Sequence, residues 1–333
     1  MNPIEGSNRI QTLDYLRGFA LLGILLINSV FLLSARTPIP GTMDEHYWKF
    51  LYLFIEGRFF TIFSFLFGIG FYLFISRAIA KGNNGYILFL RRLLAMFLFG
   101  LIHSMYHPGE ALSIYAVFGL LVLPLYKLKK ELNLVISLGL LFVFSLVGMK
   151  VLLPLPMILL GLTAGQYRVF EQISAKKKKI IWFTMIAFIL SVLALVYQNQ
   201  LLPTQGFQES NSLYWFYYIG LMVGPIVSSF YVGAYVLLVQ SSFFQRLFSP
   251  LKAYGRMALT NYLMQTVFIM IVGYGLNLSG QIHYLQSLFI CLVIYLIQLL
   301  YSIIWLRFFH FGPLEWVWRM FTYLEVPPLL KRK

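Results

Sequence analysis

Long, uninterrupted runs of apolar residues make up most of this chain. In the run Tyr284–Phe308, Arg307 is the single charged residue. A helix that crosses the hydrocarbon core of a bilayer needs roughly 20 apolar residues, or about 17–25 when it tilts. About ten segments meet or approach this requirement: Leu16–Ser34, Phe59–Ser76, Tyr86–Met105, Leu112–Tyr126, Leu132–Met149, Leu152–Tyr167, Ile180–Tyr197, Tyr214–Val239, Met257–Leu276 and Tyr284–Phe308. The sequence predicts an all-α, polytopic membrane protein with about ten transmembrane helices.

The composition excludes the other broad classes of protein. Hydrophobic residues are 60% of the 333 and charged residues only 11%, whereas a soluble domain carries about 25% charged residues. A soluble globule could not bury so much apolar surface, and a disordered chain would be far more polar. Cys291 is the only cysteine, so an intramolecular disulfide and a cysteine-based zinc site are both excluded.

The distribution of basic residues predicts the orientation. The chain has 26 Lys and Arg against 11 Asp and Glu. With ten spans and a cytoplasmic N-terminus, the outer segments hold only Arg36, Lys49, Arg58 and Lys150. Basic residues accumulate on the cytoplasmic side of membrane proteins, so both termini are expected in the cytoplasm. The run Lys176–Lys179 is expected to bind anionic lipid, and no nucleic-acid-binding module accompanies it.

The spans leave no room for a soluble domain, so residues 1–333 are expected to form a single transmembrane domain. Two segments outside the spans are amphipathic. The segment at about 44–58 is expected to lie at the outer interface, and the tail at about 309–333 on the cytoplasmic leaflet. The tail contains Trp316 and Trp318 and ends in basic residues.

Ionisable residues near membrane depth are expensive and are candidates for function. Asp14 and Arg17 are three residues apart, on one face of a helix start. They form either a structural ion pair or an anion site at the cytoplasmic mouth. Glu56 and Arg58 lie just before the second apolar run. Their charges fit a structural role and a functional role equally well.

Two further clusters carry side chains of chemical interest. The first is His103, His107 and Glu110, which could be a hydrogen-bonded structural trio or a general base oriented by a carboxylate. A zinc site is disfavoured because the spacing alone is weak and few further ligands are near, so no metal is expected. The second joins Arg256 to Asn261 and Gln265, one turn apart on a helix, which would form interhelical hydrogen bonds or line a ligand cavity.

Several motifs together resemble one known family. They are Arg9-Ile-x-x-Leu13-Asp14-x-Leu16-Arg17-Gly18-Phe19-Ala20, Phe63-Ser64-x-Leu66-Phe67-Gly68-x-Gly70, Gly100-x-Ile102-His103, Pro108-Gly109-Glu110-x-Leu112-x-x-Tyr115, Gly255-Arg256-Met257-Ala258-Leu259-Thr260-Asn261-Tyr262 and Gly312-Pro313-Leu314-Glu315-x-x-Trp318-Arg319. The set is similar to the bacterial YeiB-like integral membrane family, domain of unknown function 418, and covers nearly the whole chain. One departure is Glu110, where the family usually has an aspartate.

The resemblance carries expectations about function. The family is similar in fold to transmembrane acyltransferases of the heparan-alpha-glucosaminide N-acetyltransferase type. This implies a bacterial plasma membrane location, acetyl-CoA as donor at the cytoplasmic face and an acceptor, a small molecule or a glycan, on the far side. The catalytic histidine of that enzyme lies before the second helix, and by its spacing to Gly68 the nearest equivalent here is His46.

We therefore expect a membrane-embedded acyltransferase that moves an acyl group from a cytoplasmic CoA donor to an outer acceptor. His103 is the expected base, oriented by Glu110, with His46 as the rival base. Arg17 and Arg256 would hold the anionic donor. Asn261 or Tyr262 would polarise the acyl carbonyl.

The alternative is a transporter or permease for a small anionic or lipid-like solute, with the same buried charges lining its path. The partners expected in either case are membrane lipids, and no nucleic acid. Glycine-rich helix faces would allow contacts within one chain or between two, so a homodimer is a further hypothesis.

Overall fold

The computed structural model describes residues 10–202 and 210–331, and these residues are almost entirely helical. The α-helices are α1 (Gln11–Leu32), α2 (Met43–Phe50), α3 (Phe59–Ala80), α4 (Gly85–Ser104), α5 (Leu112–Val122), α6 (Lys130–Val147), α7 (Pro154–Gln166), α8 (Ile173–Gln200), α9 (Asn211–Leu238), α10 (Ser242–Leu247), α11 (Ser249–Arg256), α12 (Ala258–Gly275), α13 (Tyr284–Phe308) and α14 (Pro313–Tyr323). A π-helix, η2 (Leu51–Ile55), and two 3₁₀ segments, η3 (Leu123–Lys127) and η4 (Lys150–Leu152), extend three of them. The described residues contain no β-strand beyond one isolated bridge between Phe309 and Leu330.

Every apolar run of the sequence folds as a helix. In the described part of the chain, eight helical stretches are long and apolar enough to cross a membrane: α1, Met43–Ala80, α4, α6, α8, α9, α12 and α13. Two apolar stretches, Leu112–Lys127 and Lys150–Gln166, are shorter. The predicted all-α, polytopic fold is confirmed. The number of ten spans and the cytoplasmic location of the termini stay predictions.

One predicted boundary was wrong in an informative way. The first helix was expected to start at Leu16, but α1 begins at Gln11 and includes Asp14 in its first turn. An acidic residue is stabilised there by the positive end of the helix dipole. Asp14 is also buried inside the bundle, and Arg17, one turn further on, pairs with it at 3.1 Å.

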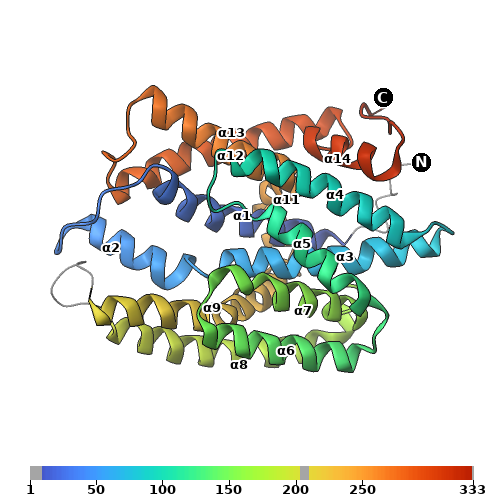
Figure 1. The fold of residues 1–333 in the computed structure, drawn as a ribbon, viewed down its shortest axis with the longest axis horizontal. Coiled ribbons are helices and arrows are strands. Elements are labelled where there is room, and N and C mark those ends of the chain that lie inside the picture. The colour runs from blue at the N-terminus through green and yellow to red at the C-terminus, as the bar shows by residue number, and fades with distance from the viewer. Residues whose placement is uncertain (1–9, 203–209, 332–333) are drawn as a thin grey trace.

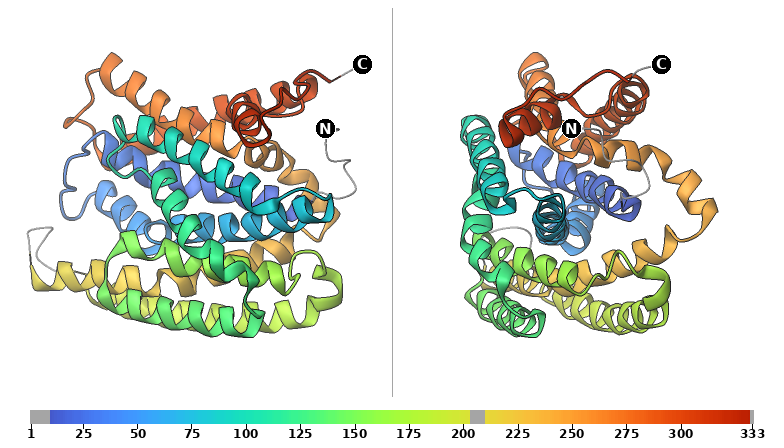
Figure 2. Two further views of the ribbon diagram at one scale, coloured as in Figure 1. Left: turned by 45° about the vertical axis from the view of Figure 1, so that its right-hand side comes forward. Right: turned by 90° about the vertical axis from the view of Figure 1, so that its right-hand side faces the viewer.

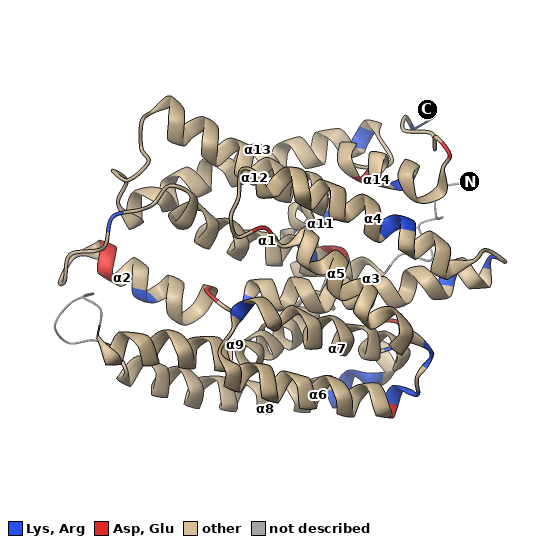
Figure 3. Ribbon diagram, viewed as in Figure 1, with Lys and Arg blue, Asp and Glu red and all other residues tan. Residues whose placement is uncertain are grey.

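The long helices lie roughly parallel to the long axis of the molecule and form layers (Figure 1). Helices α6 to α9 form one side, α12 to α14 with α4 form the other, and α1 and α3 run between them (Figures 1 and 2). Helix α3 packs mainly on α7, and α1 packs on α3, α11, α12 and α13. We call the end where α1 begins and α14 lies the terminal end, and the opposite end the distal end. Figure 3 shows most Lys and Arg residues gathered at the terminal end.

Glycines allow the closest helix crossings. A Cβ atom on Gly255 would lie 1.9 Å from the carbonyl oxygen of Asp14, and one on Gly18 would lie 2.1 Å from that of Leu251. Helix α11 therefore lies directly against the backbone of α1. This crossing matters because it brings Arg17 of α1 and Arg256 of α11 to the same part of the bundle.

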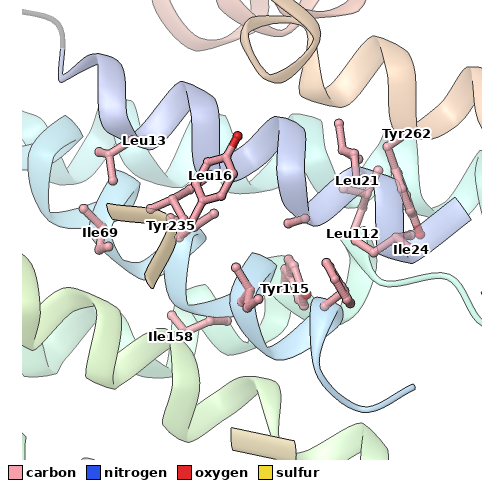
Figure 4. Packing of buried hydrophobic residues seen from close by; sticks show 14 of the residues in the cluster. Leu13, Leu16, Leu21, Ile24, Ile69, Leu112, Tyr115, Ile158, Tyr235 and Tyr262 are labelled. Carbon is pink, nitrogen blue, oxygen red and sulfur yellow. The ribbon is translucent and has the colours of Figure 1, made fainter. Parts of the chain in front are cut away.

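The buried core surrounds α1 and extends to α3, α5, α7 and α12. Figure 4 shows part of this cluster, in which Leu21 and Ile24 of α1 lie with Leu112, Tyr115 and Tyr262. The outward face of α8, in contrast, exposes large apolar side chains such as those of Trp182, Phe183 and Ile186. Aqueous solvent disfavours such a surface, whereas lipid accommodates it. The exposed apolar faces thus support a multi-pass membrane protein.

The two segments expected outside the spans both pack against the bundle. Helix α2 buries Tyr47 and Trp48 and continues through η2 to a turn at Gly57, whose φ is 78°. Helix α14 packs on α4 and α12. The indole nitrogen of Trp318 donates a hydrogen bond to the carbonyl oxygen of Arg92 at 2.8 Å. The placement of these segments at the two membrane interfaces stays a prediction.

Candidate functional site

A cavity of about 460 Å³ lies near the terminal end, between α1, α3, α4, α11, α12 and α14. Its walls carry five basic side chains, from four helices: Arg17, Arg92, Lys252, Arg256 and Arg319. Glu315 is the one acidic residue among the residues that line it. A site with this balance attracts anions, and a surrounding low dielectric strengthens the attraction. We call this space the basic cavity.

The arginines are held at the wall by defined contacts. Arg17 pairs with Asp14, and the Nη2 atom of Arg17 lies 3.5 Å from the position that a Cβ atom on Gly70 would take. The guanidinium of Arg17 thus lies next to the backbone of α3 at Gly70, at a distance that is an ordinary van der Waals contact. The guanidinium of Arg92 lies 3.5 Å from the ring centre of Trp318, a cation–π contact.

Glu315 joins α14 to the start of α12. Its carboxylate accepts hydrogen bonds from the backbone N–H of Leu259 at 2.7 Å and of Thr260 at 3.1 Å, and from the Thr260 hydroxyl at 2.6 Å. These are backbone donors that the first turn of a helix leaves unsatisfied. Burial raises the pKa of Glu315, although the hydrogen bonds from Thr260 and Leu259 act in the opposite direction. The carboxylate of Glu315 thus faces the N-terminus of α12 and caps it.

The histidine cluster lies next to the inner end of the basic cavity. The Nε2 atom of His103 lies 2.8 Å from the hydroxyl of Thr266, and its Nδ1 atom lies 3.7 Å from the carboxylate of Glu110. The Glu110 carboxylate also accepts hydrogen bonds from the backbone N–H groups of Leu112 and Ser113 and from the Ser113 hydroxyl. Burial acts to raise the pKa of Glu110, but its interactions with His103 and Ser113 and with the backbone outweigh burial and lower it. Glu110 is therefore an ionised partner for the imidazole.

His103 and His107 are four residues apart, a spacing that would place them on one helical face if the helix continued to Pro108. Helix α4 ends at Ser104 instead. The turn that follows still places the two imidazole rings 5.3 Å apart. The Nδ1 atom of His107 accepts a hydrogen bond from the backbone N–H of Gly109 at 2.9 Å. Burial, followed by the neighbouring His103, lowers the pKa of His107 to about 4, so His107 is neutral near pH 7.

Tyr262 connects the cavity to the histidine cluster. It lines the basic cavity, and its ring lies 5.2 Å from the ring of His103. Leu112 and Tyr115, which follow Glu110 in the chain, line the cavity as well. One layer of side chains therefore separates the basic cavity from the His103–Glu110 pair.

Asn261 and Gln265 take part in a buried hydrogen-bond network rather than in the cavity wall. The amide of Asn261 donates to the carbonyl oxygen of Tyr254 at 3.0 Å and to Ser302 at 2.9 Å. The amide of Gln265 donates to the Tyr254 hydroxyl at 2.6 Å. This network fixes α12 against α11 and α13, so the structure places the two amides as interhelical hydrogen-bonding groups.

The remaining candidates lie at the distal end. Glu56 and Arg58 line one cavity of about 430 Å³, and His107 lines another of about 430 Å³. Tyr52, Glu56 and Lys150 line both. His46 is exposed on α2 and lines none of the three cavities. Within residues 10–202 and 210–331, no three His, Cys, Asp or Glu side chains are grouped so that they could hold a metal ion.

Sequence reasoning missed Arg92, Lys252, Arg319 and the cap at Glu315. Basic residues near the terminal end were attributed to the orientation rule, which does not distinguish a side chain that reaches lipid headgroups from one that turns inward. The sequence did contain an indication for two of these four residues, Glu315 and Arg319. Glu315 and Arg319 belong to the motif Gly312-Pro313-Leu314-Glu315-x-x-Trp318-Arg319, which contains more charge than a simple interfacial anchor requires.

Comparison with known proteins identifies the family. Residues 164–325 match the family described as "Protein of unknown function (DUF418)". The chain is 52% identical to the uncharacterized 39.9 kDa protein in amylase 3'region of Bacillus acidopullulyticus, over 100% of this chain and 99% of the relative. It is 27% identical to the uncharacterized protein YxaH of Bacillus subtilis (strain 168), over 100% and 98% of the two chains. It is also 26% identical to the uncharacterized protein YeiB of Escherichia coli (strain K12), over 97% and 99%. The resemblance noted from the motifs is confirmed, and the chain belongs to the YeiB-like family of proteins of unknown function, DUF418.

Proposed function

We propose that this protein is a membrane-embedded acyltransferase that transfers an acetyl or other acyl group from a CoA donor to an acceptor. The observation that carries the proposal is the basic cavity, whose inner wall includes Tyr262 in ring contact with His103. A volume of about 460 Å³ is within the usual range for small-molecule sites. The phosphates of CoA are the kind of group that clustered arginines bind.

His103 is the proposed general base. Glu110 faces Nδ1 of His103 and favours the tautomer in which Nδ1 carries the hydrogen. Nε2 then has a lone pair, which accepts a hydrogen bond from the Thr266 hydroxyl at 2.8 Å in this structure. An acceptor hydroxyl or amine that displaced Thr266 would give its proton to Nε2 as its oxygen or nitrogen attacks the acyl carbon.

The attack on the acyl carbon releases CoA. The bond between the acyl carbon and the CoA sulfur breaks, and the leaving thiolate takes the proton from Nε2 of His103, which yields free CoA and restores the neutral imidazole. Tyr262 lies between the cavity and His103, so its hydroxyl is the group proposed to stabilise negative charge on the acyl oxygen. Asn261 is committed to Tyr254 and Ser302, which makes it the weaker candidate for this role.

The test uses the purified full-length protein in lipid nanodiscs with radiolabelled acetyl-CoA. The proposal expects release of free CoA, together with label transferred to an acceptor supplied as a membrane or cell-envelope extract. His103→Gln should abolish transfer and leave thermal stability nearly unchanged. His46→Gln, at the rival histidine, is the matched control and should transfer normally. Normal transfer by His103→Gln would remove His103 as the base, and loss of transfer in His46→Gln would assign the role to His46.

The second candidate function is a transporter for a small anionic or lipid-like solute. The observation that favours it is that cavities lie toward both ends of the bundle, with the layer of His103 and Tyr262 between them. Proteoliposomes loaded with the labelled acceptor extract distinguish the two functions. Flux of label without release of CoA supports a transporter, whereas release of CoA without flux supports acyl transfer.

A further inference from the structure

The first cavity at the distal end is built around a buried arginine. It lies where the turn at Gly57 meets the end of α6, the end of α8 and the start of α9. Arg58 lines it and is only 1% exposed, which makes this the largest fully buried side chain of the described protein. None of the residues that line this cavity lines the basic cavity proposed for acyl transfer.

The hydrogen bonds of Arg58 account for only part of its guanidinium. Nη1 donates to the carbonyl oxygens of Glu56 and, at 3.0 Å, of Gly220. Nη2 donates to Oε1 of Gln198 at 2.7 Å. The Nε–H group is buried and has no hydrogen-bond partner among the described residues. Two of the five N–H groups of the guanidinium therefore remain, one on Nε and one on Nη2.

Among the described residues, Arg58 has no ion-pair partner, and the charge of Glu56 acts on it only from a greater distance. The nearest carboxylate in sequence, that of Glu56, pairs with Nζ of Lys150 at 2.6 Å. No carboxylate of the described residues lies within ion-pair distance of Arg58, whose acceptors there are two carbonyl oxygens and a neutral amide. A buried cation that is neither paired nor fully hydrogen-bonded is strongly disfavoured. Such a group in a membrane protein points to a ligand that supplies the missing charge.

The rest of the cavity wall suits an organic anion. Four tyrosines contribute to it: Tyr52, Tyr214, Tyr217 and Tyr218. The charged residues are Arg58, Lys150 and Glu56, which leave one excess positive charge. Its volume of about 430 Å³ accommodates a small molecule. Aromatic walls with a few fixed polar groups are typical of ligand pockets, and the planar guanidinium matches the geometry of carboxylate and phosphate oxygens.

We propose that the cavity at Arg58 is a binding site for an oxyanion, a phosphate or carboxylate group, which accepts hydrogen bonds from the Nε–H and the remaining Nη2–H of Arg58. Lys150 lies on the same wall and adds positive charge. The oxyanion could belong to a free solute or to the headgroup of an anionic lipid in the distal leaflet. Both present the same oxygens to the guanidinium, so the experiment has one arm for each source.

The first arm measures binding of inorganic phosphate and of glucuronate to the protein in nanodiscs of zwitterionic phosphatidylcholine, by isothermal titration calorimetry. The second arm measures retention of phosphatidylglycerol from mixed nanodiscs, by native mass spectrometry. Binding in the first arm assigns the site to a soluble anion, and retention in the second alone assigns it to a lipid headgroup. Absence of binding in both arms overturns the proposal.

Substitutions of the lining residues test whether the anion binds in the cavity at Arg58. Arg58→Lys keeps the charge but removes the planar fork, and it should weaken binding at least tenfold. Lys150→Gln, at an exposed residue, should weaken it about threefold. Arg36→Gln is the matched control, because Arg36 lies at the same end and outside this cavity, and its side chain donates to the carbonyl oxygen of Gly280. Equal binding by wild type and Arg58→Lys overturns the proposal.

A further variant covers the case in which Arg58→Lys does not fold. Gln198→Glu places a carboxylate beside Nη2 of Arg58, where the amide oxygen now accepts at 2.7 Å. This internal counter-ion should compete with the oxyanion and reduce its affinity at least tenfold, in protein that elutes as a single folded species. If Gln198→Glu binds phosphate and phosphatidylglycerol as wild type does, the ligand is not at Arg58.

Discussion

The ring of Tyr262 lies 5.2 Å from the ring of His103, and the same tyrosine forms part of the wall of the basic cavity. The layer of side chains that contains Tyr262 thus stands between a cluster of cations that suits a phosphate-bearing donor and an imidazole held by a carboxylate. This relationship joins the two halves of the proposed reaction. Mutations in the cavity should therefore change the affinity for the donor, whereas mutations of His103 should change the rate of the chemical step.

Neutralising a cation of the basic cavity should weaken donor binding. Arg256→Gln removes one charge from the wall, and a charge-assisted hydrogen bond contributes about 1.5–3 kcal/mol. We expect the dissociation constant for acetyl-CoA to rise roughly 10- to 100-fold, measured by calorimetry in nanodiscs. Arg246→Gln changes an exposed arginine on α10 that does not line the cavity and should have no effect. Equal losses in both variants would indicate a general surface effect.

Acid should destabilise the protein through His107. Its pKa is about 4 in the folded state, against about 6.5 for an unperturbed histidine. Between these values the unfolded state binds the proton and the folded state does not, so stability falls as the pH decreases from about 6.5 to about 4. At about 1.4 kcal/mol per pKa unit, the loss amounts to about 3 kcal/mol.

The variant that tests this prediction is His107→Asn. Its side-chain oxygen can still accept the hydrogen bond from Gly109, which Nδ1 accepts at 2.9 Å in the native protein, but it cannot bind the proton. Thermal unfolding in detergent at several pH values between 4 and 7.5 should show a flatter profile than that of the wild type. His46→Asn, at an exposed histidine, is the control. An unchanged slope in His107→Asn would contradict the assignment.

Removing the carboxylate of Glu315 should destabilise the terminal end. Glu315→Ala leaves the first N–H groups of α12 without the acceptor that they have at 2.7 and 3.1 Å. We expect a loss of about 2–3 kcal/mol in the free energy of unfolding, since a buried donor without a partner costs about that much. Glu325→Ala, at an exposed acid just after α14, should cost little. The melting temperatures of the wild type, Glu315→Ala and Glu325→Ala in detergent test this prediction, and equal values for Glu315→Ala and the wild type would contradict it.

A methyl group on Gly255 should separate α11 from α1. Its Cβ atom would lie 1.9 Å from the carbonyl oxygen of Asp14, which is backbone and cannot rotate away. Gly255→Ala is expected to cost about 3 kcal/mol, the upper part of the range for overpacking, and to weaken acetyl-CoA binding by moving Arg256 away from Arg17. Gly139→Ala is the control, because nothing lies within 4 Å of its added Cβ atom. Wild-type stability in Gly255→Ala would show that the crossing is adaptable.

The fold could be predicted from the sequence because lipid imposes a simple condition. A chain that crosses a bilayer must satisfy its backbone hydrogen bonds within each span, so each long apolar run had to be a helix. The helix ends were less predictable. Asp14 was placed at a helix start, two residues before the apolar run that begins at Leu16. It is buried in the first turn of α1, where it pairs with Arg17.

The site was only partly predictable. Arg17, Arg256 and Tyr262 were identified and do share one cavity. Asn261 looked equivalent to Tyr262 in sequence, yet the two face different neighbours, because they are adjacent on a helix and point about 100° apart. Which of them meets a cavity depends on how α12 is rotated against α11 and α13. That rotation is set by packing between segments distant in sequence, and no local pattern encodes it.

The stacking of Trp318 on Arg92 has a practical consequence. The indole lies 3.5 Å from a guanidinium that would be drawn toward any anion entering the basic cavity. Indole fluorescence responds to a charge held over its face, so occupancy of the cavity should change the emission of this one tryptophan. With the other five tryptophans of the chain replaced by phenylalanine, the protein would carry its own optical sensor of ligand binding, and titration with candidate donors would require no label.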